Sequence, residues 1–339
     1  MDYGDSDIRR LLAVFRGEIP DRVPKFEFII NRRNVSAILG PAADRSSEGL
    51  PGTDAVLLAR KTGMDAVGFG IVWPFGRVSA KASDGSVHYS TGSVKGWSDL
   101  GAYQPYDVSG SFRHLEDLLQ ASLGTGVGVW VYIHSVFDSA VLAMGYHDYM
   151  LKLYDDLRFI EALCDLAFEF YHGVMKRLVR YPLAFIHIAD DVAHKTGLLV
   201  RPDVFRHLWV ERTRKLIEPP RRKGIPLTFH SDGNYEEIIP DLVQLGFCAI
   251  NPLEPIAMDI FEIKRRFGDR LCLMGNIDIA GPLAFGEPED VRREVEDKVR
   301  RLGLGGRYVC SSSHSITDGI PPRNFAAMVD AVHRYGGYA

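Results

Sequence analysis

The sequence predicts an α/β fold of the (β/α)8 or TIM barrel type. Short apolar runs alternate with longer amphipathic segments along the 339 residues, which is the pattern of parallel strands connected by helices. Eight strand–helix units can be counted, and a closed parallel barrel requires eight. The chain is long for one hydrophobic core, but barrels reach this size as one unit, so we expect a single domain over residues 1–339.

The expected elements follow one another regularly from the N-terminus. Residues 6–17 are typical of a capped opening helix that ends at Gly17. Short apolar runs predict strands at 23–30, 66–72, 127–134, 183–190, 226–230, 248–251, 271–275 and 308–312. Helical periodicity predicts helices at roughly 35–40, 138–155 with 158–180, 202–218, 235–245, 258–267, 288–303 and 321–335.

One segment interrupts this alternation. Residues 76–95 alternate with a period of two around Asp84-Gly85, which is a favoured hairpin turn. We expect a β-hairpin inserted after the second strand. It is either a structural flap or a lid over the barrel mouth, where loops often carry function.

The charge of the chain argues against partners that need a strong field. The formal net charge is -4, so no basic field is present to hold nucleic acid or an anionic membrane. A local basic cluster at Arg221, Arg222 and Lys223 is typical of a solvated helix end. We therefore expect no nucleic-acid and no membrane partner.

The cysteines and the N-terminus favour the cytoplasm. The four cysteines (Cys164, Cys248, Cys272 and Cys310) form no C-x-x-C pair and do not form a disulfide framework. The first residues are too charged for a signal peptide, and no apolar stretch approaches the ~20 residues that span a bilayer. The expected location is cytoplasmic.

Polar side chains follow most of the expected strands at the point where each strand ends. They are Glu27 within the first strand, Asp190 and Asp191 after the fourth, His230 and Asp232 after the fifth, Asn251 and Glu254 after the sixth, Asn276 and Asp278 after the seventh, and His314 after the eighth. Because these strand ends share one mouth, we expect a small-molecule site there. Singly, each group also has a structural interpretation: Asp191 or Asp278 as a helix cap, Asn276 as a loop partner and His230 as a buried histidine.

Two kinds of chemistry fit His230, Asp232 and His314. Imidazole and carboxylate are usual zinc ligands, and an open catalytic site needs only three protein ligands. The two histidines also fit general acid–base roles, since the imidazole pKa lies near neutrality. Cys310 is a softer candidate ligand, although we expect it to point into the barrel wall.

Four motifs carry a resemblance to a known family. PDRVP near the start, HSDGN after the fifth strand, GNID after the seventh and SHSITDGIPPRN after the eighth resemble the uroporphyrinogen decarboxylase superfamily in order and spacing. The resemblance extends over nearly the whole chain and is best from Asp190 onward. It implies a (β/α)8 barrel and either decarboxylation or corrinoid-dependent methyl transfer.

The sequence departs from the decarboxylase pattern at two places. The first arginine of the family's R-Q-A-G-R motif is replaced by Ile29, while Arg33 matches the second. The essential aspartate after the second strand is replaced by Gly70, which removes the carboxylate that would stabilise the pyrrole cation. The resemblance therefore favours the methyltransferase branch.

The sequence also departs from the thiol-methylating enzymes. Their H-x-C-G string retains its histidine as His230, but Asp232 replaces the first cysteine and His314 the second. A His/Asp/His site is harder and more Lewis acidic than a thiolate site, and it suits an ether or hydroxyl oxygen. The pattern resembles decarboxylase-like proteins that demethylate methoxy groups.

The resemblance implies a function and residue roles. We expect a methyltransferase that moves a methyl group from a methylated small molecule, such as a methoxylated aromatic, to a corrinoid on a separate small protein. The expected catalytic residues are His230, His314, Asp232 and Asp191. The expected zinc ligands are His230, Asp232 and His314. The expected substrate-binding residues are Glu27, Asn276, Asp278, Arg33, Trp73 and Phe137. Trp73, Phe75 and Phe137 are either a sandwich for an aromatic ring or barrel-to-helix packing.

Two other functions stay open. A decarboxylase or related lyase would use Arg32 and Arg33 as carboxylate clamps, although both also fit a solvated helix start. A non-catalytic binding protein would keep the barrel as a scaffold, but it would have no use for the ionisable strand ends. The sequence leaves the oligomeric state open.

Overall fold

The computed structural model describes residues 3–4, 6–81 and 87–338, and its centre is a curled parallel sheet. The sheet has seven strands in the order β1-β4-β5-β8-β9-β10-β11, and every neighbouring pair is parallel. The bounds are β1 (Ala66–Ile71), β4 (Gly128–His134), β5 (Phe185–Ala189), β8 (Leu227–His230), β9 (Ala249–Asn251), β10 (Cys272–Met274) and β11 (Tyr308–Val309). This arrangement confirms the α/β barrel class.

The first expected strand, 23–30, differs from the prediction. It joins the β11 side of the sheet only through isolated parallel bridges, Lys25 to Cys310 and Ile30 to Ile316. Pro24 lacks an N–H donor, which limits how far a regular ladder can extend here. Between this segment and β1 lies a cavity of about 30 Å³, lined in part by Glu27, Phe28 and Trp130.

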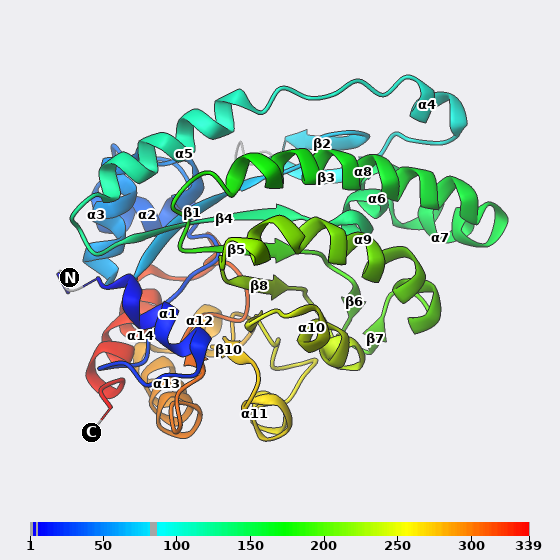
Figure 1. Cartoon of the computed structure of the whole chain (residues 1–339). Coiled ribbons are helices and arrows are strands. Elements are labelled where there is room, and N and C mark those ends of the chain that lie inside the picture. The colour runs from blue at the N-terminus through cyan, green and yellow to red at the C-terminus, as the bar shows by residue number, and fades with distance from the viewer. Residues whose placement is uncertain (1–2, 5, 82–86, 339) are drawn as a thin grey trace.

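Helices cover the outer face of the sheet. Figure 1 shows α8 and α9 side by side along it, in agreement with the contacts between these two helices. The helices after the opening one are α2 (Arg32–Leu39), α3 (Gly52–Thr62), α4 (Trp97–Gly101), α5 (Ser109–Ser122), α6 (Val136–Met144), α7 (Tyr146–Asp155), α8 (Leu157–Leu178), α9 (Pro202–Arg222), α10 (Ile239–Leu245), α11 (Ile260–Phe267), α12 (Pro282–Phe285), α13 (Pro288–Leu302) and α14 (Pro322–Tyr335). Of these, α3, α5 and the short helices α4 and α12 were not among the expected helices.

The opening helix, α1 (Ile8–Arg16), agrees with the prediction at both ends. The side chain of Asp7 caps it by accepting a hydrogen bond from the backbone N–H of Arg9. Gly17 ends it in the left-handed region at φ 82°, which glycine adopts without strain.

The expected hairpin is present as β2 (Arg77–Lys81) paired antiparallel with β3 (Val87–Gly92). Its turn, Asp84-Gly85, lies outside the described residues. The hairpin packs on α6, and the backbone N–H of Val94 just beyond it donates to the carbonyl of Ala143. A second, unpredicted hairpin, β6 (Ala193–His194) with β7 (Gly197–Leu198), follows β5.

Large aromatic side chains fill the interior of the curled sheet. Phe26, Trp130 and Phe185 belong to this inner cluster, and the rings of Trp130 and Phe185 stack with centroids 5.5 Å apart. Glycines on β1 make room for them. A Cβ at Gly68 would lie 2.6 Å from the Trp130 ring, and one at Gly70 would lie 2.2 Å from Tyr132. The interior is therefore a packed core and not a pore.

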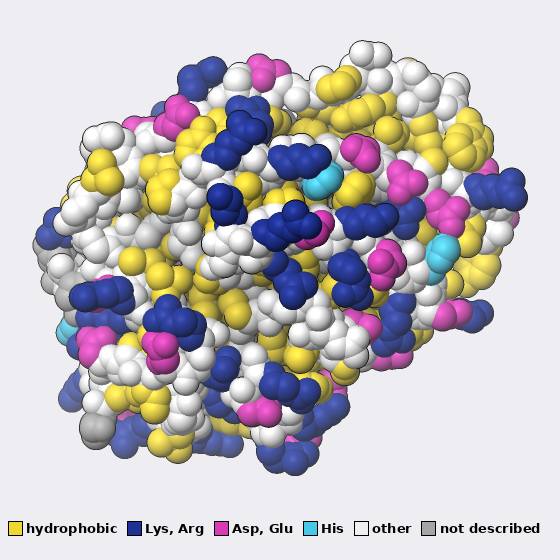
Figure 2. Space-filling model, viewed as in Figure 1, with side chains coloured by type: hydrophobic (Ala, Val, Ile, Leu, Met, Phe, Trp, Pro, Cys, Tyr) yellow, Lys and Arg dark blue, Asp and Glu magenta, His cyan; other side chains and the backbone are white. Residues whose placement is uncertain are grey.

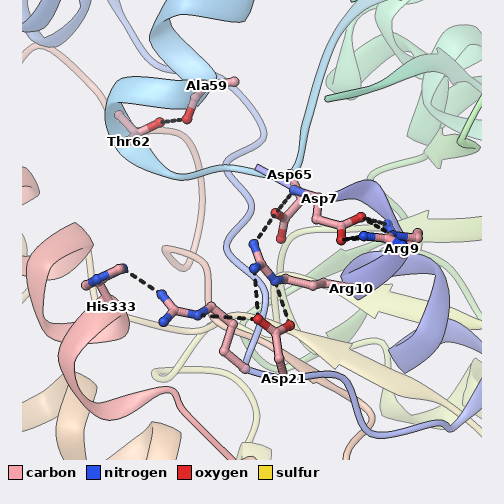
Figure 3. Close-up of polar contacts among 9 residues, drawn as sticks. Asp7, Arg9, Arg10, Asp21, Ala59, Thr62, Asp65 and His333 are labelled. Atoms are coloured by element: carbon pink, nitrogen blue, oxygen red, sulfur yellow. Dashed lines mark hydrogen bonds and ion pairs between the residues drawn. The ribbon is translucent and has the colours of Figure 1, made fainter. Parts of the chain in front are cut away.

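Ion pairs connect α1 with other parts of the chain at the N-terminal end of the strands. Figure 3 shows Arg10 of α1 between two carboxylates, with Nε 2.7 Å from Asp21 and Nη1 3.3 Å from Asp65. Asp65 immediately precedes β1, and burial raises the pKa of its carboxyl group to about 7. In a barrel this end serves stability, while chemistry collects at the opposite end.

Basic side chains gather over α8 and α9 in Figure 2, with acidic side chains between them. Two of the ion pairs on α9 are Arg214 with Glu211 at 3.2 Å and Arg212 with Asp165 at 2.7 Å. None of the helices in the described residues combines the length and the apolar character needed to cross a bilayer.

Candidate active site at the carboxyl ends of the strands

Side-chain alternation along the strands determines which groups reach the mouth of the barrel. Trp130 and Tyr132 of β4 belong to the inner cluster, so His134, two residues further on, continues the inward row. The neighbouring positions Val131 and Ile133 belong to the outer core. His230 ends β8, and its ring stacks on Phe28 with centroids 4.6 Å apart, which places it in the same inner space.

His230 is held in one tautomer. It is only 3% exposed, and its Nδ1 lies 2.8 Å from Oδ1 of Asn251 at the end of β9. The amide group of Asn251 donates to the carbonyl of Met274, which directs its oxygen toward the histidine. The proton of a neutral His230 therefore lies on Nδ1, and Nε2 keeps its lone pair.

Two carboxylates lie near the free Nε2 of His230, and one of them also contacts His314. Asp232 Oδ1 lies 3.7 Å from it and Asp191 Oδ1 lies 3.9 Å from it, while Asp232 Oδ2 lies 3.3 Å from Nε2 of His314. The backbone N–H of Asp232 donates to Asp191 at 2.9 Å, which joins the ends of β5 and β8. The structure thus brings together the four residues that the sequence predicts to be catalytic.

Three of these residues have the spacing of metal ligands. One ligand atom from each of His230, Asp232 and His314 lies within 4.8 Å of the other two. Oδ1 of Asp232 is buried and has no hydrogen-bond partner in the described part of the chain. A buried carboxylate oxygen without a partner, facing a free imidazole lone pair, fits a divalent cation such as zinc.

His314 differs from His230 in its hydrogen bonding. The backbone N–H of Ser315 donates to His314 Nδ1 at 2.6 Å, so the proton of the neutral ring lies on Nε2 and points toward Asp232. In this state His314 is a hydrogen-bond donor. It becomes a metal ligand when Nε2 releases that proton or when the ring turns.

Burial and the neighbouring charges shift the pKa values of Asp191 and Asp232 in opposite directions. Burial first, and then the charge of Asp232, raise the pKa of Asp191 to about 6. Burial acts in the same direction on Asp232. However, the hydrogen bond with His314 and the nearby His230 outweigh it and hold the pKa of Asp232 below its usual value. The site therefore keeps one carboxylate charged while its neighbour protonates more readily.

Glu27 lies in the wall beside this group. It accepts hydrogen bonds from the backbone N–H and the hydroxyl of Ser312, and the same hydroxyl contacts the carbonyl of His314. Burial raises the pKa of Glu27 to about 8 despite these donors. Within the described residues its carboxyl group hydrogen-bonds to Ser312 and makes no ion pair with His230, so Glu27 positions the loop that carries His314.

Three predicted substrate-binding residues are engaged in loop structure. The amide of Asn276 donates to the carbonyl of Leu253 at 2.6 Å. The carboxylate of Asp278 accepts from the backbone N–H of Ala280 at 2.8 Å, as a cap does. The backbone and guanidinium of Arg33 bond to Asp318. In the described residues none of these three side chains contacts the group around His230.

The predicted aromatic sandwich lies in the outer core. Trp73 is 1% exposed and packs against Phe75 and Tyr103, while Phe137 is fully buried against Tyr149 and Phe205. These rings pack between barrel and helices, as the second of the two sequence interpretations had it. Phe28 is the ring that reaches the site, at 4.6 Å from His230 and 4.8 Å from Tyr132.

A match to a protein-family model shows which family the chain belongs to. The model described as uroporphyrinogen decarboxylase (URO-D) matches residues 89–335, which is more than half of the chain. The chain belongs to the uroporphyrinogen decarboxylase family.

Comparisons with individual proteins agree with URO-D membership. A uroporphyrinogen decarboxylase from Methylococcus capsulatus is 31% identical over 38% of this chain and 35% of its own length. One from Coxiella burnetii is 26% identical over 49% of this chain and 48% of its own. The chain thus spans less than half the length of these curated relatives. A solved structure, a methyltransferase from Methanosarcina mazei, has a TM-score of 0.73 and 19% identity, covering 98% of this chain and 99% of that one.

One URO-D position is changed in a way the structure explains. The sequence resemblance aligns Gly70, which precedes the matched residues 89–335, with the essential aspartate of the decarboxylases. The Tyr132 ring occupies the space beside it, and the hydroxyl of Tyr132 donates to Glu48 of the short helix η1 (Ser47–Gly49). A side chain at position 70 would collide with this ring, so the carboxylate is absent and its place is filled.

Sequence reasoning missed several residues of this URO-D site. They are Phe28 as the stacking ring of His230 and the pair of His134 and Asp138, while Asn251 was expected at the mouth but not as the partner of His230. His134 ends an apolar strand, as His230 does, so the same strand-end rule would have found it. Phe28 gave no such signal, since an aromatic residue in an apolar run is usually core.

Proposed function

We propose that this chain is a methyltransferase that moves a methyl group from a methylated small molecule to a corrinoid. The observation that carries the proposal is the arrangement of His230, Asp232 and His314 at one end of the strands, where lone pairs and a proton converge. Such a group suits the activation of an oxygen that must leave with a pair of electrons. The full-length likeness to a protein named a methyltransferase supports the proposal.

The chain's own residues supply the activation of the leaving oxygen. When the C–O bond breaks, its electrons stay with the oxygen, and the methyl carbon bonds to the acceptor. His314 presents a proton on Nε2 toward the site, and His230 and Asp232 would hold a zinc ion whose positive charge stabilises the same oxygen. Asn251 keeps the ring proton of His230 on Nδ1, so that Nε2 is free to bind the metal ion.

The surroundings favour an aromatic donor. The ring of Phe28 is partly exposed and extends from His230 to Tyr132, so a flat substrate can lie against it with an ether oxygen near the histidines. We therefore propose a methoxylated aromatic as the donor. The corrinoid is the second reactant and is carried by a separate small protein.

A carboxy-lyase of the decarboxylase type is the second candidate. It is favoured by the curated relatives, which are uroporphyrinogen decarboxylases. Against it stand Gly70 in place of the essential aspartate and the engagement of Arg33 by Asp318. These two features leave a carboxylated substrate without its expected partners.

An anaerobic assay tests methyl transfer directly. Purified protein of known metal content is mixed with cob(I)alamin and methylated thiols, amines or aryl ethers, and the absorbance of methylcobalamin is followed. We expect methylcobalamin to form with an aryl ether and to be lost in His230→Ala, but not in His147→Ala, whose side chain lies on the surface. The proposal fails if no donor class methylates the corrinoid, and release of CO2 from a carboxylated substrate would favour the lyase.

A further inference from the structure

A second histidine occupies the mouth of the barrel, at the end of β4. His134 follows Trp130 and Tyr132 in the inward row of that strand, and its ring centroid lies 6.0 Å from that of Tyr132. Its side chain is 18% exposed, whereas His187, one layer deeper, is fully buried. Because of this exposure, a molecule in the mouth can touch His134 but not His187.

A buried carboxylate orients His134. Nδ1 of the ring hydrogen-bonds to Oδ2 of Asp138, which lies in the first turn of α6 and is only 2% exposed. The backbone N–H of Asp138 donates to Asp190 at 2.6 Å, and the other oxygen of Asp190 accepts from the indole of Trp209 at 2.6 Å. Buried hydrogen bonds through Asp190, just after β5, and Trp209 of α9 therefore hold the His134–Asp138 pair in place.

The bond to Asp138 determines what His134 offers to the mouth. A carboxylate only accepts hydrogen bonds, so the proton of the neutral ring lies on Nδ1 and Nε2 carries a lone pair. In the described residues Nε2 has no hydrogen-bond partner. A surface pair with similar chemistry, His147 Nδ1 with Asp148 at 3.0 Å, is exposed on α7.

A row of rings at the carboxyl ends of the strands connects His134 with His230. The rings of Phe28 and Tyr132 lie between them, with successive centroid distances of 4.6 Å from His230 to Phe28 and 4.8 Å from Phe28 to Tyr132. Burial first, and then the charges of Asp138, Asp191 and Asp232, raise the pKa of the Tyr146 hydroxyl.

We propose that His134, oriented by Asp138, accepts a hydrogen bond from a hydroxyl group of the substrate. This inference rests on the proposed function and narrows its substrate class to methoxylated aromatics that keep a free hydroxyl group. The ring of such a substrate lies against Phe28 and Tyr132, with its ether oxygen near His230 and its hydroxyl at Nε2 of His134. His134 is then a specificity residue, and Asp138 positions it.

A binding experiment tests this without requiring methyl transfer. The affinities of 4-methoxyphenol and 1,4-dimethoxybenzene, which differ by one free hydroxyl at the end of the ring opposite the ether, are measured by calorimetry on the full chain. We expect the phenol to bind roughly 3- to 10-fold more tightly, as one net hydrogen bond provides. We expect this preference to disappear in His134→Leu and to fall in Asp138→Leu, because an apolar side chain at 138 removes the acceptor that holds the ring proton on Nδ1.

The matched controls are His147→Leu and Asp148→Leu, which alter the surface pair and should leave the preference unchanged. If His134→Leu does not fold, as judged by circular dichroism, Asp138→Leu alone decides. The inference is overturned if the wild-type chain shows no preference, if it binds neither compound, or if the preference in Asp138→Leu equals that of the wild-type chain. Since no corrinoid is present, these outcomes do not depend on whether the chain transfers methyl groups.

Discussion

Nδ1 of His230 lies 2.8 Å from Oδ1 of Asn251, and this hydrogen bond leaves Nε2 of the histidine free to bind a ligand. Second partners of this kind typically change metal affinity 10–100-fold when removed. We therefore expect Asn251→Ala to lower zinc affinity by about 10–100-fold, because the imidazole loses its fixed tautomer. Zinc retained after dialysis against graded chelator measures this.

Asn324→Ala is the matched control for Asn251→Ala. Asn324 is also a buried asparagine, and its amide donates to the carbonyls of Pro282, Leu283 and Gly286, away from the mouth. It should lose stability but keep the wild-type zinc affinity. Equal zinc affinity in Asn251→Ala and the wild-type chain would show that His230 does not depend on this bond.

Glu27 should make stability fall with rising pH. Burial raises its pKa from 4.5 to about 8, so between these values the folded chain holds a proton that the unfolded chain releases. The stabilisation is complete below the unfolded pKa and is lost as pH rises through about 8. One such proton changes the unfolding free energy by at most about 1.4 kcal/mol per pH unit.

Glu27→Gln mimics the protonated form and should flatten this dependence. The amide oxygen can still accept from the backbone N–H of Ser312. Urea unfolding at several pH values between 5 and 8.5 measures the slope, with the exposed Glu18→Gln as control. Parallel curves for Glu27→Gln and the wild-type chain would mean that Glu27 is already ionised in the folded state.

Gly70→Ala should destabilise the chain by about 1–3 kcal/mol, because a Cβ there would lie 2.2 Å from the Tyr132 ring. Tyr132→Leu in the same chain should restore part of the loss by shortening that side chain. Gly173→Ala is the control. It lies within α8 with no atom near a new Cβ, and it should be neutral or stabilising by up to about 1 kcal/mol. Thermal melts compare the variants, and a harmless Gly70→Ala would contradict the tight packing of β1 on β4.

Arg10→Ala should destabilise the chain by about 3 kcal/mol or more at pH 8. Arg10 is a cation beside the buried Asp65. Burial raises the pKa of Asp65 to about 7, so the loss of stability should be smaller at pH 5, where this carboxyl group is neutral. The neighbouring Arg9 is 86% exposed and pairs with Asp7 (Figure 3). Arg9→Ala should change the unfolding free energy by less than about 1 kcal/mol. A loss for Arg10→Ala that does not vary with pH would argue against a role for Asp65.

The sequence predicted the strands better than the closure of the sheet. Apolar runs that end in polar groups identify strands such as β5 and β8. Burial selects the apolar residues of the strand, and a site at the mouth selects the polar residues at its end. Segment 23–30 has the same composition but is attached only by isolated bridges, and hydrogen bonding at a seam leaves no periodic signal. The helices α3 and α5 were missed between clearer elements.

The site was predictable in part for the same reason. His230, Asp232, His314 and Asp191 meet because parallel strands end at one edge, which follows from topology alone. The direction of a side chain after the strand end does not follow from topology. Trp73 and Phe137 therefore lie in the outer core, while Phe28 reaches the mouth.

The filled interior of the barrel has a kinetic consequence. Because Phe26, Trp130 and Phe185 close the space below the site, the two reactants of the proposed methyl transfer would have to enter through the same opening. A bulky partner that docks there first would shut out the small molecule. We therefore expect compulsory-order kinetics, in which the small donor binds before the macromolecule and its demethylated product departs last.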